Sequence, residues 1–367
     1  TYHRVIHLVE GDNLYSTRAV ELDDAIDGLG LSYTSTFHIR FQWKDNFDIP
    51  TDGFAFDNIE IAPGVGVPPP AEPEPNIAGH QAPELWALGY RGEGVLLGNI
   101  DAGVDITHPD LVSRIWTNPG EIAGNLIDDD NNGYVDDIQG WDFDNDTNNV
   151  IPTDSDTHGT KTSGIAVGDG TLGRATGMAP GATMVVAEIE NEAHYVLAQQ
   201  YMLDVGVDVI TSSYSWKWPN SPRPDYHLLR QIVEMELAAG IVHANSIGNQ
   251  GSLQGTHPIP FNISAPGNSP GPFRHPDQPT IGGITAVIAC GGITLPNDDP
   301  YSSSGVGPSA WDDLTLYDAA YPHPQDSSLW DYPYGGFAGG GPGLLKPDVV
   351  AYTVDIMTTT IGGSYAT

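Results

Sequence analysis

Apolar runs alternate with amphipathic stretches along most of the chain. Five runs are nearly continuous in hydrophobic residues, at 94–100, 182–187, 207–210, 240–244 and 285–290. Such runs are typical of strands buried on both faces of a sheet. Helical periodicity appears between them at 193–204 and 225–239, and the second stretch has four apolar residues on one face: Leu229, Ile232, Val233 and Leu237. The pattern predicts an α/β fold with a doubly wound, mostly parallel sheet and helices on both faces.

The first sixty residues follow a different pattern, with period-two alternation at 37–41 and at 54–61. This alternation predicts strands, and three or four strands are too few to close a sandwich alone. We therefore expect residues 1–62 to be the C-terminal part of a β-sandwich-like module. Its end, 52–59, resembles the closing strand of jelly-roll modules found beside secreted enzymes. A plain structural segment and a module that binds a surface or a glycan both remain open.

Six prolines with interspersed glycine and glutamate fall between residues 63 and 78. Proline at this density biases the backbone toward extended polyproline geometry. The segment 63–78 is therefore predicted to be an interdomain spacer, which leaves residues 79–367 as the α/β domain.

The charge balance limits the classes of partner. The 367 residues contain 13 Lys and Arg against 48 Asp and Glu, a formal net charge of −35. This excludes nucleic-acid binding by phosphate neutralisation, which needs a basic stripe. No stretch of eighteen uncharged apolar residues exists, so no membrane span is expected. The acidity favours a secreted protein, and Cys290, the single cysteine, lies in an apolar run and is expected in the core.

Polar residues with catalytic potential follow the predicted strands or lie near the end of the chain: Asp101, His158, Asn249 and Ser364. Ligands meet parallel sheets at the carboxyl ends of their strands. A serine nucleophile needs a neighbouring base, the base needs an orienting carboxylate, and the developing oxyanion needs a donor. None of the four residues is decisive alone, because the chain contains 12 His and 48 carboxylates.

Over residues 79–367 the sequence resembles the subtilisin-like serine peptidases, the subtilase family. Four family motifs match in order: the aspartate motif at Asp101, His-Gly-Thr at His158, Gly-Asn at Asn249, and Gly-Thr-Ser-x-Ala-x-Pro at Ser364. The order Asp, His, Ser is that of subtilisin and differs from that of chymotrypsin. The resemblance implies a serine endopeptidase that acts on a peptide or protein substrate.

The resemblance also implies a role for each matched residue. Ser364 is expected to be the nucleophile and His158 the general base, which Asp101 orients. Asn249 is expected to donate its amide to the oxyanion. A substrate backbone is expected to pair as an added strand with three residues: Ser213, Tyr214 and Ser215. For Trp216 and Trp218, which follow, pocket and core positions are both open, and a structural role is expected for His108.

Some positions depart from the family pattern. Gly363 replaces the threonine before the serine, Tyr352 and Thr353 stand where a Pro-Gly pair is common, and Thr367 ends the chain before the family's proline. We expect a chain truncated at both ends. Two alternatives therefore stay open: a catalytically impaired homologue that binds peptides or partners, and an adhesion or carbohydrate-binding protein that acts through its β module.

An acidic loop precedes the histidine motif. Ten aspartates fall between residues 128 and 156, with no Lys or Arg between Arg114 and Lys161. The loop matches the first half of an EF-hand loop, but Gln139 occupies the twelfth position. We predict a structural Ca²⁺ site without EF-hand helices, with these ligands: Asp128, Asp130, Asn132, the Tyr134 carbonyl and Asp136. Asp137 is the alternative to Asp136, and a solvated loop without a cation is the alternative to the whole site.

Overall fold

The computed structural model describes residues 73–152, 157–174, 176–216, 225–257, 259, 261–272, 284–307, 309 and 344–367. The chain divides into two compact units, Thr1–Pro68 and Pro69–Thr367. The β-sandwich-like module expected at 1–62 lies outside the described residues.

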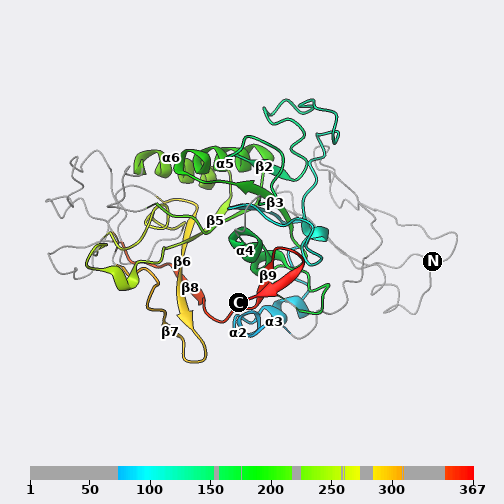
Figure 1. The fold of residues 1–367 in the computed structure, drawn as a ribbon. Coiled ribbons are helices and arrows are strands. Elements are labelled where there is room, and N and C mark those ends of the chain that lie inside the picture. Colours follow the sequence, from blue (N-terminus) through cyan, green and yellow to red (C-terminus); the bar gives the residue numbers. More distant parts are fainter. Residues whose placement is uncertain are drawn as a thin grey trace, which may run out of the picture. The chain divides into compact units, whose positions relative to one another are not determined.

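An eight-stranded sheet forms the centre of the described part of the second unit (Figure 1). The strands are β1 Leu96–Asp101, β2 Gly140–Asp142, β3 Thr183–Glu188, β4 Val209–Ser212, β5 Val242–Ser246, β6 Val287–Thr294, β7 Asp299–Pro300 and β8 Val349–Tyr352. Their order is β2-β3-β1-β4-β5-β6-β7, and β8 also pairs with β6. Every pair is parallel except β6 with β7. The mostly parallel α/β sheet is therefore confirmed.

Helices cover both faces of the sheet. On one face, α5 (Glu192–Val205) and α6 (Tyr226–Ala238) share an apolar cluster with β1, β3 and β4. On the other face, α4 (His158–Val167) contributes to a second cluster with β1 and β3. Alternate residues of β3 therefore enter different clusters, Val185 the first and Met184 the second. Burial on both faces explains why the strands are nearly continuous in apolar residues.

The predicted elements agree with the observed ones to within a few residues. The run 94–100 contains most of β1, and the stretches 193–204 and 225–239 correspond to α5 and α6. The structure adds a detail to the predicted apolar face of α6. Leu237 is only partly buried, whereas Glu236 beside it is fully buried and joins a polar network described below.

The proline-rich spacer ends earlier than predicted. Residues inside the predicted range 63–78 begin helix α2, Pro75–Gly79, which is followed by α3, Ala82–Ala87. Ile77 of α2 is fully buried against Ala82 and Trp86 of α3. Proline at the first helical position has a backbone angle already suited to the helix, so Pro75 starts α2 instead of extending the chain.

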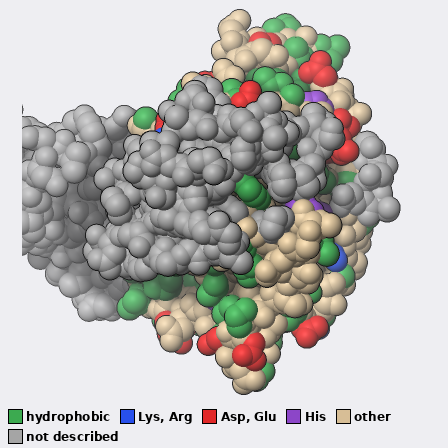
Figure 2. All heavy atoms as spheres, turned by 90° about the vertical axis from the view of Figure 1, so that its left-hand side faces the viewer, with side chains coloured by type: hydrophobic (Ala, Val, Ile, Leu, Met, Phe, Trp, Pro, Cys, Tyr) green, Lys and Arg blue, Asp and Glu red, His purple; other side chains and the backbone are tan. Residues whose placement is uncertain are grey.

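Four short elements complete the described unit. They are the 3₁₀ helices η1, Val112–Arg114, and η2, Gly251–Leu253, and the strands β9, Thr358–Thr360, and β10, Ser364–Ala366. Strands β9 and β10 form a separate antiparallel hairpin, drawn in red in Figure 1. No helix in the described ranges is both long and apolar enough to cross a membrane. Among the described side chains that can be seen in Figure 2, acidic groups are spread widely and few basic groups appear.

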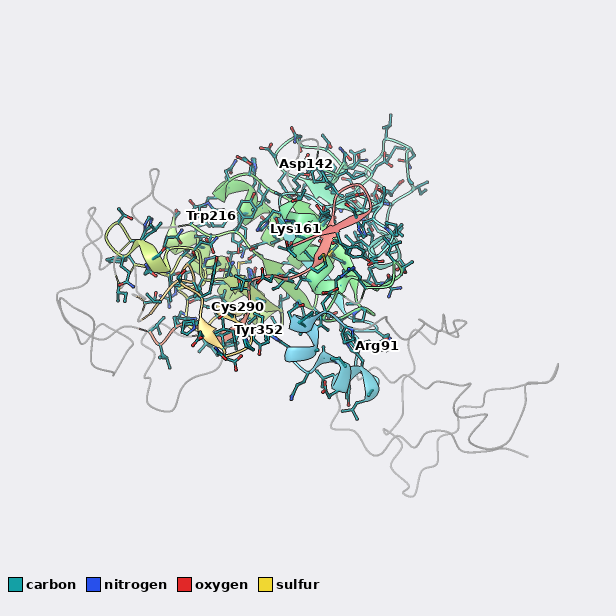
Figure 3. The ribbon with its side chains drawn as sticks, turned by 60° about the horizontal axis from the view of Figure 1, so that its bottom comes forward. Arg91, Asp142, Lys161, Trp216, Cys290 and Tyr352 are labelled. Atoms are coloured by element: carbon teal, nitrogen blue, oxygen red, sulfur yellow. The ribbon has the colours of Figure 1, made fainter. Side chains whose placement is uncertain are left out.

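Cys290 lies on β6 beside β8, the strand that carries Tyr352 (Figure 3). The thiol is partly buried, and this burial, together with the charge of Asp348, raises its pKa to about 11. The cysteine is therefore held as a thiol and is not activated as a nucleophile.

Candidate active site

Strand β1 brings Asp101 to the carboxyl edge of the sheet. Its side chain is 1% exposed. The carboxylate accepts hydrogen bonds from the Ala102 N–H at 2.8 Å and from the Thr162 hydroxyl at 2.9 Å. His158 Nδ1 lies 2.6 Å from Asp101 Oδ1. Three partners therefore fix the carboxylate in one orientation.

His158 is the first residue of α4, and its side chain is 49% exposed. We assign the ring proton to Nδ1, because the Asp101 carboxylate oxygen that faces it can only accept a hydrogen bond. Nε2 is then the basic nitrogen of the ring. The arrangement matches the carboxylate–imidazole half of a Ser-His-Asp site, in which the carboxylate fixes the tautomer. A histidine held in this way can remove a proton from a hydroxyl that reaches Nε2.

The glycine and the threonine of the His-Gly-Thr sequence hold α4 close to the loop after β1. A Cβ on Gly159 would collide with the carbonyl oxygen of Gly103, in the loop after β1. Thr160 Oγ1 accepts a hydrogen bond from the Asp105 N–H at 2.9 Å. The small residue allows α4 to approach the β1 loop, and the threonine ties the two together. This close approach sets the position of His158 against Asp101.

The other predicted site residues on strand ends face the same edge. Strand β4 pairs with β1, and Ile100 is aligned with Ser212, so Ser213 and Tyr214 follow β4 beside the end of β1. Strand β5 pairs with β4, and the exposed Asn249 follows its last residue, Ser246. Three parallel neighbours thus direct the aspartate, the segment 213–215 and the asparagine to one edge of the sheet.

Aromatic rings support the segment after β4. Trp216, labelled in Figure 3, forms two backbone hydrogen bonds with Ala265, at 2.9 and 2.8 Å. Its ring stacks on Tyr214 at 6.1 Å and lies 4.4 Å from Tyr195 of α5. Trp216 therefore lies against the core, while Trp218 lies outside the described residues.

Ser364 has a different environment from the one expected of a nucleophile. It is exposed and begins strand β10, where it is aligned with Thr360 of β9 across a three-residue loop, 361–363. Gly362 and Gly363 in this loop both have positive φ. The nucleophile of the family precedes a helix, whereas this serine lies in a hairpin. A Gly-Gly pair between two short strand-like runs is a hairpin signal, and it competes here with the serine motif.

The hairpin packs on α4 and on the loop after β1. Thr358 and Thr359 donate hydroxyl hydrogen bonds to the carbonyls of Lys161 and Thr160, at 2.9 and 2.7 Å. A Cβ on Gly164 would collide with both threonine side chains. Figure 3 shows Lys161 beside the red hairpin. The structure thus brings Asp101 and His158 together and places Ser364 in a hairpin beside α4, the helix that begins at His158.

Three residues of the 105–110 loop hold the hairpin, and the resemblance gave a catalytic role to none of them. His108 Nε2 lies 3.0 Å from the Ser364 carbonyl oxygen, and Asp110 accepts a hydrogen bond from the Tyr365 hydroxyl. Asp105 accepts the Gly362 N–H at 2.9 Å. Although burial opposes it, hydrogen bonds from Thr107 and Gly362 lower the pKa of Asp105. His108 is fully buried, which fits the structural role expected for it.

The acidic loop gathers a set of carboxylates that differs in part from the predicted one. Oxygens of Glu121, Asp128 and Asp130 lie within 4.8 Å of one another. Glu121 lies outside the EF-hand-like pattern, which is why the sequence did not single it out. Asp128 and Asp130 belong to the predicted set, whereas Asp136, another member of that set, is not one of the three converging carboxylates.

Asp136 and Asn132 bind the protein itself. Asp136 is 2% exposed, and its carboxylate accepts three backbone N–H groups, from Gly124, Asn125 and Leu126. Asn132 uses its Oδ1 to accept the Tyr134 N–H at 2.8 Å. Asp136 therefore serves to close the loop. Glu121 also accepts three backbone N–H groups, from Asp129, Asp130 and Asp136, and it is a candidate ligand because its oxygen converges with those of Asp128 and Asp130.

The chemistry of the three carboxylates fits a hard cation such as Ca²⁺, which prefers oxygen ligands. The neighbouring Asp137 adds to the local negative charge, and burial raises its pKa against hydrogen bonds from Tyr201 and Asn118. Close carboxylates without a basic partner repel one another, and a bound cation would relieve this repulsion.

Comparison with known proteins identifies the family. A family model described as the subtilase family matches residues 92–324, more than half of the chain. Subtilisin-like protease 1 of Plasmodium berghei is 34% identical over 126 residues, which are 32% of this chain and 20% of the relative. The major intracellular serine protease of Bacillus subtilis is 26% identical over 47% of this chain and 48% of the relative.

Minor extracellular protease Vpr of Bacillus subtilis is 26% identical over 61% of this chain and 25% of the relative. The chain thus spans about half, or less, of each of these curated relatives. Its family is nevertheless clear from the extent of the model match and from the sheet with Asp101 at its edge. The chain belongs to the subtilase family of serine peptidases.

Proposed function

We propose that this protein is a serine endopeptidase in which His158 is the general base and Asp101 orients it. The observation that carries the proposal is the 2.6 Å contact between His158 Nδ1 and the buried Asp101 carboxylate, with the ring half exposed. A serine hydroxyl loses its proton to His158 as it attacks a peptide carbonyl, and the proton passes to the leaving amine. Water then hydrolyses the acyl-enzyme.

Two further groups would act on the substrate. The exposed Asn249 is proposed to donate its side-chain amide to the oxyanion of the tetrahedral intermediate. The segment 213–215 is proposed to pair with an extended peptide backbone as an added strand. Both proposals are supported by the adjacent, parallel β1, β4 and β5, which end at one edge of the sheet.

The nucleophile can be assigned in two ways. Ser364 remains the candidate from the sequence, but its hairpin position favours the alternative of a catalytically impaired, peptide-binding homologue. Labelling the full-length protein with a fluorophosphonate, followed by peptide mapping, tests both. A label on Ser364 that a Ser364→Ala variant loses supports the assignment. A label on another serine would assign the nucleophile to that residue. An absence of labelling would favour the catalytically impaired homologue.

We also propose that a structural Ca²⁺ binds the acidic loop through Glu121, Asp128 and Asp130, as calcium is commonly bound by subtilases. The bound ion would neutralise the loop that leads to His158 and stabilise the native state. Asn132, the Tyr134 carbonyl and Asp136 remain the other candidate ligands from the sequence.

Secretion is a further proposal, supported by the formal net charge of −35. The names of the relatives include both an intracellular and an extracellular protease, so they do not decide between the compartments. Immunodetection in separated medium and cell fractions of the source organism tests the proposal, and retention in the cells contradicts it. The alternative of an adhesion or carbohydrate-binding role depends on residues 1–62, outside the described part.

A further inference from the structure

A second carboxylate–imidazole pair lies under the carboxyl edge of the sheet. His243 Nδ1 of β5 is 2.8 Å from Glu236 Oε2 of α6, and both side chains are 0% exposed. The other carboxylate oxygen of Glu236 accepts the Gln199 amide at 2.9 Å. Both oxygens of the buried carboxylate are therefore engaged by side chains, which is the condition for burying such a group at a tolerable cost.

The pair continues to a serine hydroxyl. His243 Nε2 lies 2.8 Å from Ser212 Oγ, and the Tyr195 hydroxyl lies 3.0 Å from the same oxygen. Burial, together with the charge of Glu236, raises the pKa of Tyr195 well above its usual value, so Tyr195 stays a hydrogen-bond donor. Ser212 is 3% exposed and the other members are fully buried. A peptide carbonyl cannot reach this hydroxyl, so the array is not a second catalytic triad.

Asn245 connects this array to the segment after β4. Its Nδ2 lies 2.6 Å from Ser212 Oγ, 3.3 Å from the Ser212 carbonyl and 3.0 Å from the Tyr214 carbonyl. The reversed amide would point an oxygen at two carbonyl oxygens, so the orientation is fixed by chemistry. The Tyr214 contact lies within the segment 213–215, the proposed partner of the substrate backbone.

The same array also supports the far end of that segment. The Tyr195 ring lies 4.4 Å from the Trp216 ring, and the Trp216 backbone is paired with Ala265. The network therefore contacts the chain before the segment at Ser212, within it at Tyr214 and after it at Trp216. Asn245 Oδ1 and Gln199 Oε1 are buried without a hydrogen-bond partner, but Glu236, His243, Ser212 and the Asn245 amide nitrogen are all paired. A shift of the segment would break these pairs in a buried setting, which favours one geometry.

We propose that the buried network Glu236–His243–Ser212–Asn245 positions the segment 213–215 for pairing with an extended peptide. The proposal rests on the peptide-binding part of the proposed function. These side chains lie beneath the segment and do not touch the peptide, so they are positioning residues. Their loss is expected to weaken the binding of long peptides, which pair with the segment, more than the binding of ligands too short to pair with it.

Asn245→Ala in the full-length protein gives the most direct test. The ligand is an extended peptide with a non-cleavable bond at the scissile position. We expect its Kd to rise about tenfold, because a displaced segment would lose about one hydrogen bond to the peptide backbone. The KM for an extended cleavable peptide should rise by a similar factor, and the KM for a short acyl ester should change by less than about twofold. A Kd that is unchanged overturns the proposal, and so does a wild type that binds no extended peptide.

A matched control separates positioning from general stability. Asn262 is equally buried, and its amide also donates to two main-chain carbonyls, those of Gln250 and His257. Asn262→Ala should destabilise the fold without changing the ratio of long to short substrate KM. An equal change of that ratio in both variants contradicts the inference.

Two further results keep the test decisive. If Asn245→Ala does not fold, the same Kd and KM measurements are made on Ser212→Ala. Ser212→Thr keeps a hydroxyl and should restore the values of the wild type. If the wild type binds the extended peptide but neither cleaves it nor reacts with a fluorophosphonate, the proposed peptidase activity is wrong while the Kd comparison still decides the positioning role.

Discussion

Two carboxylate–imidazole pairs in this molecule have nearly the same geometry and different surroundings. Each histidine meets its carboxylate through Nδ1, at 2.6 Å in the Asp101–His158 pair and at 2.8 Å in the Glu236–His243 pair. The His158 side chain is 49% exposed and that of His243 is 0% exposed. Exposure of the histidine side chain therefore separates the proposed catalytic base from the buried structural pair, and the distance within the pair does not.

The two pairs also differ in where their residues sit. Asp101 ends a central strand and His158 starts a helix, so both face the edge where parallel sheets meet ligands. Glu236 and His243 lie on the inner face of α6 and within β5, and the chain closes over them. The following substitutions test this contrast, from the largest expected effect to the smallest.

Asp101→Asn should have the largest effect on activity. Without the carboxylate the His158 ring loses the partner that selects its tautomer, and kcat should fall by about four orders of magnitude, as in other Ser-His-Asp sites. Peptide hydrolysis by purified protein measures this. Asp144→Asn is the matched control, because Asp144 makes an exposed 3.8 Å contact with His194. Comparable losses in both variants would contradict the assignment of His158 as the base.

Glu236→Ala should have the largest effect on stability. The substitution leaves His243 buried without its carboxylate, and we expect a loss of about 3–5 kcal/mol in the free energy of unfolding. Urea denaturation followed by fluorescence measures it. On the same helix, Glu234 pairs with Arg230 at 2.7 Å but is 41% exposed, so Glu234→Ala should cost less than about 1 kcal/mol. Equal costs would remove the distinction between buried and exposed pairs.

Gly159→Ala should have an intermediate effect on stability and also reduce activity. The added methyl group meets the Gly103 carbonyl, which is backbone and yields little, so we expect a loss of about 1–3 kcal/mol and a displaced His158. Gly255→Ala is the control, since a Cβ there meets open space. Thermal unfolding and peptide hydrolysis of both variants test the idea. A stable, active Gly159→Ala variant would show that α4 does not need this close approach.

Calcium should have the smallest effect. At a free concentration ten times its Kd, the ion should stabilise the fold by about 1.4 kcal/mol. Scanning calorimetry with calcium and with chelator measures the shift of the midpoint. Asp128→Asn should reduce the shift, whereas Asp208→Asn, a carboxylate that accepts the Leu96 N–H elsewhere in the fold, should leave it unchanged. Identical midpoints with ion and chelator would remove the proposed site.

The sequence predicted the features that depend on local pattern. Apolar runs such as 182–187 predict buried strands, because a parallel strand that is covered on both faces has apolar residues at nearly every position. The positions of Asp101 and His158 follow from motifs at a strand end and at a helix start. Their contact brings together residues 57 positions apart in the chain, and the motifs indicated it only through the resemblance to a family.

Features that depend on tertiary contacts could not be predicted from the sequence. Glu236 lies in an otherwise apolar helical face, and only the fold shows that its carboxylate hydrogen-bonds with His243 and Gln199. Glu121 joins Asp128 and Asp130 although it lies outside the EF-hand-like pattern. At Ser364, a short serine motif and a Gly-Gly hairpin signal overlap, and the pairing of β9 with β10 follows the hairpin signal.

The rate of fluorophosphonate labelling in His158→Ala and His243→Ala, measured side by side on folded full-length protein, tests the central claim most directly. We expect His158→Ala to keep the fold and to lose labelling. We expect His243→Ala to lower stability, while the protein that remains folded still reacts with the fluorophosphonate. Labelling that survives without His158, or that disappears from folded protein without His243, would contradict the account.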